Sequence, residues 1–238
     1  MRQKDSMSRR SVLSVAAAAA AMAAGGRVLA QPTQPRTQSV PEQEKTMPVK
    51  TYTNAEFYDA EGKFQGDKAK QAYWDMFARF GYPVPQTLQK GMWVLDFGMK
   101  DFVRCGMAGI FWYNDQVNSY FGHEIFLLPG QMIAEHAHQA TSKGKAKMEA
   151  WHVRHGMIYT FGEGEETKPC PVKLPDSQLD GGISVKHCTP LQPGEVASLQ
   201  RATARHFMIA GPEGAVVTEY GTFHDMDGLV FTNPKAKL

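Results

Sequence analysis

Short strand-like segments follow one another from Met92 to the end of the chain, and they constrain the fold more than any other feature of the sequence. Each is a short apolar or alternating run that ends near Gly, Pro or Asp, and no helical pattern alternates with them. Such a series predicts a mainly β protein, a jelly-roll barrel of antiparallel strands. The predicted strands are Trp93–Phe97, Met107–Tyr113, Tyr120–Leu128, Met132–His138, Glu149–Arg154, Met157–Phe161, Ile183–His187, Val196–Gln200, Arg205–Ile209 and Ala215–Gly221.

A helical lead-in is expected before the strands. Apolar residues recur at three- and four-residue spacing from Ala69 to Phe80, Asp67 is placed to cap the helix, and Gly81 is placed to end it. We interpret this apolar stripe as core packing. A shorter helical turn is expected near residues 54–58.

The first thirty residues have the pattern of an export signal. Arg9 and Arg10 directly precede the uncharged, alanine-rich run Val12–Ala24, and the segment ends at Ala30 in residues suited to signal peptidase. This resembles a twin-arginine signal peptide, which implies transient contact with the Tat export machinery and a periplasmic protein. The alternative is a buried or amphipathic N-terminal helix. The run is too short to span a bilayer, so no stable membrane anchor is expected.

Residues 31–46 are rich in Pro and Gln and poor in apolar residues, which predicts a flexible linker. Residues 47–238 are then expected to form a single domain. The first thirty residues hold five of the 26 basic and one of the 24 acidic residues, so the remainder has a formal charge of −2. A near-neutral chain of this kind gives no case for nucleic-acid binding.

Three cysteines leave the redox state open. At most one pair can form within one chain, and Cys170 with Cys188 is the candidate pair because both lie near loop-like sequence. The alternative is three free thiols, including Cys105.

A histidine–glutamate motif is the strongest signal for chemistry. Gly130 is followed after five residues by the HXH segment His136–His138, then by Glu149, and after six more residues by Gly156. Alternate residues of a strand share a face, so both imidazoles can meet at one point, with Glu149 expected from the next strand of the same hairpin across residues 139–148. The glycines are expected as turn residues. Two imidazoles and a carboxylate predict a divalent metal site, the alternative being a chance pair of surface histidines.

This pattern resembles the first motif of the cupin superfamily, G(X)5HXH(X)nE(X)6G, although the segment between HXH and Glu149 is unusually long. The second cupin motif is poorly matched. Arg205-His206-Phe207 lies at about the expected distance, but the usual PXG before the histidine is missing. His206 is therefore either a further metal ligand or a histidine of the core.

A narrower resemblance is to the D-lyxose isomerase family of cupins, in which a long loop between HXH and Glu is normal. It covers the chain from about Asp96 onward. The segments that carry it are Leu127–Gln131, Glu135–His138, Gly144–Glu149, Arg205–Phe207, Ala210–Glu219 and Phe231–Pro234.

The resemblance implies a metal-dependent isomerase that interconverts D-lyxose and D-xylulose, and further D-mannose and D-fructose, through an enediolate. It implies Mn²⁺ or another divalent metal, which would polarise the sugar carbonyl. Glu219 is the expected proton-shuttling base, and Lys147 the cation that steadies the substrate oxygens. The implied metal ligands are His136, His138, Glu149 and His206.

Trp151 and Tyr159 are expected on the apolar floor of the substrate pocket, since both would continue the inward face of the strand that begins at Glu149. Lys147 should turn inward, in contrast to the solvated Lys143 and Lys145. The other histidines have no partner spacing and are interpreted as ordinary; they are His123, His152, His155, His187 and His224.

Two other functions stay open. A cupin with three histidines and a glutamate could hold a redox metal and act as a dioxygenase, or the protein could be a non-catalytic periplasmic sugar-binding cupin. The resemblance also leaves a homodimer open, since cupins often pair their sheets.

Overall fold

The computed structural model describes residues 47–238. The predicted signal peptide (residues 1–30) and linker (residues 31–46) lie outside this range. Among the described residues, no helix combines the length and the apolar character needed to cross a membrane.

The N-terminal part is helical, as expected. A 3-10 turn at Asn54–Glu56 (η1) precedes helix α1, Gly66–Phe80, which ends where Gly81 adopts a left-handed φ of 61°. The cap differs from the prediction: Gln65 occupies the N-cap position, and Asp67 lies in the first turn, where its charge favours the positive end of the helix dipole. A second helix, α2 at Gln86–Gly91, was not predicted.

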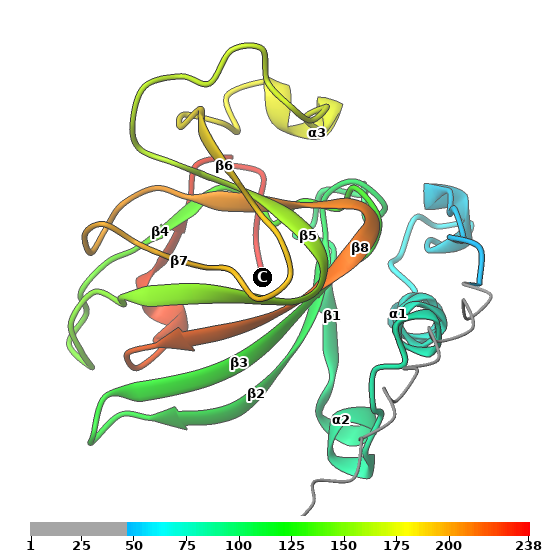
Figure 1. The fold of residues 1–238 in the computed structure, drawn as a ribbon, viewed down its shortest axis with the longest axis horizontal. Helices are drawn as coiled ribbons and strands as arrows, with labels where there is room; N and C mark the ends of the chain where they lie inside the picture. The colour runs from blue at the N-terminus through cyan, green and yellow to red at the C-terminus, as the bar shows by residue number, and fades with distance from the viewer. Residues whose placement is uncertain (1–46) are drawn as a thin grey trace, which may run out of the picture. The chain divides into compact units, whose positions relative to one another are not determined.

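Antiparallel strands make up most of the remaining fold (Figure 1). One large sheet has the order β1-β2-β3-β8-β5-β6, with β7 also paired to β5, and β4 pairs with β9 in a separate ribbon. Segment 132–138 is joined to the start of β8 by bridges between Met132 and Ile209 and between His136 and His206. The strands are Trp93–Leu95 (β1), Met107–Asp115 (β2), Tyr120–Leu127 (β3), His136–His138 (β4), Glu149–Gly162 (β5), His187–Leu191 (β6), Val196–Ser198 (β7), Phe207–Gly221 (β8) and Leu229–Phe231 (β9). Two short elements complete the set, Asp176–Leu179 (α3) and Met226–Gly228 (η2).

Two pairs of predicted strands are continuous. β5 joins the predicted strands on either side of Gly156, and β8 joins those on either side of Gly211–Gly214. Gly156 is not a turn residue: it has a φ of 66° inside β5, between register shifts at residues 153–155 and 156–158. A bulge accommodates an extra residue without ending the strand, which is why a glycine here does not mark a turn.

The predicted hairpin between HXH and Glu149 is wrong. β4 pairs with β9, whereas β5 pairs with β6, β7 and β8. Residues 139–148 therefore connect two different sheets. In a jelly roll, consecutive strands commonly lie in opposite sheets, and a local motif does not reveal which distant strand completes each pair.

Apolar side chains fill two layers. One cluster fills the inside of the barrel and includes Val153, Ile158 and Val217. In a second cluster, the apolar stripe of α1 packs on the outside of the large sheet, where the rings of Phe77 and Phe126 lie 4.6 Å apart. Burying a side chain of this size stabilises the fold by about 1.5–3 kcal/mol. The expected mainly β, cupin-like barrel with an N-terminal helix is confirmed.

Candidate metal centre

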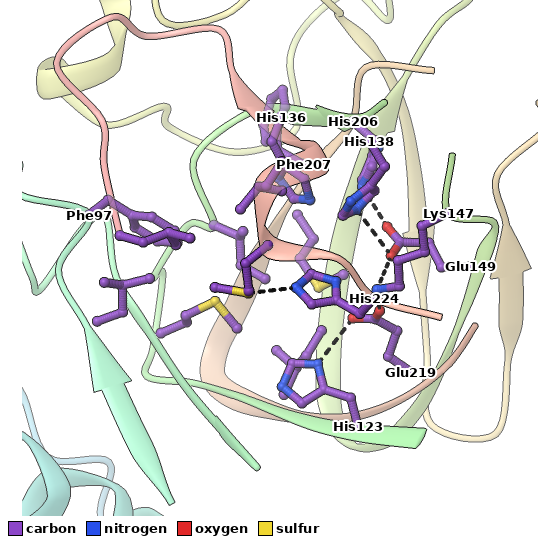
Figure 2. A pocket seen from close by; sticks show the side chains of 18 of the residues that line it. Phe97, His123, His136, His138, Lys147, Glu149, His206, Phe207, Glu219 and His224 are labelled. Carbon is purple, nitrogen blue, oxygen red and sulfur yellow. Dashed lines mark hydrogen bonds and ion pairs between the residues drawn. The ribbon is translucent and has the colours of Figure 1, made fainter. Parts of the chain in front are cut away.

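The four predicted metal ligands meet inside the barrel (Figure 2). His136 and His138 lie on β4, Glu149 begins β5, and His206 directly precedes β8. One ligand atom from each of the four lies within 4.8 Å of every other. His138, Glu149 and His206 are buried, so the set is an interior cluster and not a chance group on the surface.

Backbone carbonyls orient two of the imidazoles. The Nδ1 atom of His136 lies 2.9 Å from the carbonyl oxygen of Ala134, and Nδ1 of His206 lies 2.9 Å from that of Ala204. A carbonyl can only accept, so each Nδ1 carries a proton, and Nε2 is the nitrogen that faces the other ligands. This is the arrangement that metal-binding histidines usually adopt.

The donor atoms fit a divalent ion. Nε2 of His138 and Nε2 of His206 are buried and have no hydrogen-bond partner within residues 47–238. They lie 3.4 Å and 2.6 Å from the two carboxylate oxygens of Glu149. Three imidazole nitrogens and a carboxylate facing one point are a donor set that suits a first-row divalent metal.

Lys147 and Glu219 lie beside this cluster. The Nζ atom of Lys147 is 2.7 Å from a carboxylate oxygen of Glu149 and donates to Glu219. All three residues are at most 5% exposed. Burial alone would raise the pKa of Glu149, but the ammonium of Lys147 and the nearby His206 outweigh it and hold that pKa well below its usual range. Conversely, burial would lower the pKa of Lys147, but Glu149 and Glu219 raise it, so Lys147 is an ammonium at pH 7.

A cavity of about 330 Å³ opens onto the metal ligands. Its polar lining residues are the four ligands, Lys147, Glu219 and two further histidines, and the other lining residues are mostly apolar. The C-terminal Leu238 also lines it. The apolar wall includes Trp93, Phe97, Phe111, Ile125, Ile133 and Phe231.

The two predicted pocket-floor residues have different positions. Trp151 lines the cavity, with its ring 5.3 Å from that of His206. Tyr159 does not line the cavity and packs instead against a separate apolar cluster that includes Phe161 and Ile209. The reason is the two register shifts in β5, after which Ile158 follows Val153 on the inward face and residue 159 turns away.

Sequence reasoning missed two histidines of the cavity, His123 and His224. His123 lies on β3 between Phe121 and Ile125, all of them buried on one strand face, so strict alternation could have identified it. His224 lies in the segment between β8 and β9, where no periodicity applies. Burial, with a smaller effect of Lys147, lowers the pKa of His224 to about 3, so this ring is neutral at pH 7.

The three cysteines, all within the described range, are free thiols. Cys105 and Cys188 are buried and Cys170 is exposed. The candidate pair Cys170 and Cys188 is therefore not joined, and the alternative of three free thiols holds for the described residues.

No family model matches the chain. Among characterised proteins, it is similar to the D-lyxose/D-mannose isomerase of Thermosediminibacter oceani, with 33% identity over 144 residues that cover 60% of this chain and 77% of the relative. It is also similar to the D-lyxose ketol-isomerase of Cohnella laeviribosi, with 29% identity over 171 residues that cover 71% of this chain and 91% of the relative.

Solved structures show the same fold at lower identity. The L-ribose isomerase of Cellulomonas parahominis, solved with L-ribose, has a TM-score of 0.59 and 15% identity, and the match covers 77% of this chain and 96% of that one. The L-ribose isomerase of Geodermatophilus obscurus has a TM-score of 0.58 and 14% identity over 76% of this chain and 95% of that one. At this identity, the likeness shows a common fold alone.

Proposed function

Because the chain belongs to the D-lyxose isomerase family, we propose that it is a metal-dependent aldose–ketose isomerase that interconverts D-lyxose and D-xylulose. D-mannose and D-fructose are the second proposed pair, since they share the configuration around C2 and C3 and add a carbon at the far end. The observation that carries the proposal is the cluster of three histidines and Glu149 in the wall of a cavity that also holds Lys147 and Glu219. The cavity volume, about 330 Å³, is in the range of small-molecule sites.

The proposed ion is Mn²⁺, because imidazole and carboxylate ligands suit it. When bound, the ion would polarise the carbonyl group of the open-chain sugar and stabilise the negative charge that develops on O1 and O2. The residues that would hold it are His136, His138, Glu149 and His206.

Glu219 is the proposed base. Isomerisation removes the proton from C2 of the aldose and returns one to C1 of the ketose, while a hydroxyl proton moves from O2 to O1. Glu219 is buried and lies at the cavity wall, and its Oε1 atom accepts a hydrogen bond from Lys147. A carboxylate in this position can carry the carbon-bound proton from C2 to C1.

Lys147 supplies a fixed positive charge beside the reacting oxygens. Its ammonium lies between Glu149 and Glu219, so it remains charged when buried. Preorganised charge of this kind lowers the barrier most where negative charge develops during the reaction. Trp151 supports the proposal as an apolar contact for the sugar carbons.

The test is a panel of aldoses and ketoses with Mn²⁺-loaded protein. We expect turnover of D-lyxose and D-xylulose, and deuterium at C1 or C2 of the product when the reaction runs in D₂O. Retention of all substrate hydrogen would indicate either a hydride shift or return of the same proton by Glu219, and full activity of Glu219→Gln would then establish the hydride shift and remove the need for Glu219 as a base. O₂ uptake with a redox metal would support a dioxygenase, and sugar binding without turnover would support a binding protein.

Substitution of the base gives a sharper test. Glu219→Gln keeps the size and polarity of the side chain but cannot take a proton, so kcat should fall by about 10²-fold or more with unchanged metal content. Glu124→Gln is the matched control, because Glu124 is also buried but bonds to Tyr82 and Thr218 and does not line the cavity. Equal activity of the two variants would exclude Glu219 as the base.

Export by the twin-arginine route to the periplasm is a further part of the proposal. It rests on the Arg9–Arg10 pair and the uncharged run that follows. Changing both arginines to lysine should leave the full-length chain in the cytoplasm. A periplasmic protein that still began at Met1 would contradict cleavage of the leader.

A further inference from the structure

Glu219 has a second buried partner besides Lys147. The Nδ1 atom of His123 lies 3.2 Å from Oε2 of Glu219, and the two residues face each other across the paired strands β3 and β8. His123 is 4% exposed and Glu219 is 5% exposed. Since a carboxylate can only accept, Nδ1 of His123 carries the proton and donates it to this contact.

The second ring nitrogen of His123, Nε2, is surrounded by protein atoms. This atom is buried and has no hydrogen-bond partner among the described residues. It lies directly against Gly109, where an added Cβ would overlap it and would also come within 2.7 Å of Trp93 and 3.0 Å of the Glu124 carbonyl oxygen. Gly109 therefore leaves the space that the imidazole occupies.

Aromatic rings fix the orientation of the imidazole. Trp93 stacks on it with ring centres 5.5 Å apart and an interplanar angle of 25°. The rings of Phe111 and Phe121 lie 4.9 Å and 5.6 Å away. This packing holds the ring with Nδ1 toward Glu219.

We propose that His123 is a positioning residue for Glu219, held by Gly109 and the three aromatic rings so that it donates a hydrogen bond to Oε2. Lys147 binds Oε1 and His123 binds Oε2, so the carboxylate has one donor at each oxygen and cannot rotate. Each oxygen keeps a second lone pair, which remains free to accept a proton. Figure 2 shows this arrangement, with Glu219 between Lys147 and His123.

The inference rests on the proposed function, because it assigns His123 a role through the base. The orientation of the Glu219 carboxylate affects the chemical step, and so kcat, more than it affects substrate binding. His123→Phe keeps a flat ring among the aromatic neighbours but removes the donor. It should lower kcat by about 10- to 100-fold and change KM little.

Three comparisons separate positioning from a general loss of structure. His123→Asn places an amide N–H at the position of Nδ1 and should recover part of kcat. His123→Phe made in the Glu219→Gln background should have little further effect, because the residue acts through Glu219. His155→Phe is the matched control, since His155 packs on Phe80 and Tyr82 and should keep full activity.

A measurement on the metal-free protein is independent of turnover. The ¹⁵N chemical shifts of the His123 ring should show a protonated Nδ1 and an unprotonated Nε2. The opposite tautomer would overturn the inference, as would a His123→Phe enzyme with unchanged kcat, or an equal loss of kcat from His123→Phe and His123→Asn. If the wild type converted no sugar, the proposed function would fail, and the ring shifts would still decide the His123–Glu219 contact.

Discussion

Gly156→Ala is expected to destabilise the protein because of the bulge in β5. Gly156 has a φ of 66°, a left-handed conformation that costs a residue with a Cβ about 1–2 kcal/mol. An added Cβ would also overlap the carbonyl oxygen of Gly214 and lie 2.9 Å from its carbonyl carbon and 3.2 Å from Cα of Ala215. All three atoms belong to the backbone of β8, so no side chain can rotate to make room.

The left-handed φ and the overlap with the backbone of β8 both lower the free energy of unfolding of the Gly156→Ala variant. Overpacking of this kind costs about 1–3 kcal/mol. The lower entropy of an unfolded chain with Ala offsets about 0.4–1 kcal/mol of the total. We therefore expect the free energy of unfolding to fall by about 2–4 kcal/mol, which at an m-value of about 2 kcal/mol/M lowers the urea midpoint by about 1–2 M.

Gly162→Ala is the matched control in the same strand. In the part of the chain that the structure describes, no atom lies within 4 Å of the Cβ position at Gly162, and the φ of Gly162 is not left-handed. Its free energy of unfolding should remain within about 1 kcal/mol of the wild type. Equal urea midpoints for the two variants would refute the argument that backbone crowding at the bulge requires glycine.

Two further predictions concern the metal centre and the thiols. His206→Ala should lose most of the bound Mn²⁺ measured by elemental analysis, because one of four ligands is removed, while His152→Ala should keep it; unchanged stoichiometry would leave a three-ligand site. Cys170 should react with iodoacetamide at pH 8 in the folded protein, whereas Cys188 should not, because burial, with a smaller effect of Cys170, raises the pKa of Cys188 to about 11. The reactivity of Cys188 should increase as the pH rises toward that value, and equal rates at pH 8 would contradict the prediction.

Several parts of the structure could be predicted from local sequence. The apolar stripe of α1 and the left-handed Gly81 at its end follow from spacing and residue type. His136 and His138 share a face because alternate residues of a strand do so, and Lys147 turns inward while Lys143 stays exposed. The ligand His206 depended on the family resemblance, since its own motif is degenerate.

The pairing of the strands and the positions of the β-bulges could not be predicted from local sequence. Alternation defines the inward face only while the register is constant, and two register shifts in β5 turn Tyr159 out of the cavity while Trp151 stays in it. The partner of β4 is β9, a strand that was not predicted and that lies more than ninety residues further along the chain.

The sequence by itself determined the strand-rich fold, the helix that covers one face of it, and the residue types at the metal centre, because each depends on a short-range pattern of spacing. Only the tertiary structure decided that β3 and β8 are neighbours, which brings His123 to 3.2 Å from Glu219, 96 residues away. It also decided that Gly109 leaves space for the imidazole of His123. These contacts depend on which distant strands pair and in which register, and the hydrogen bonds that join two strands are made by the backbone, which is the same for almost every residue type.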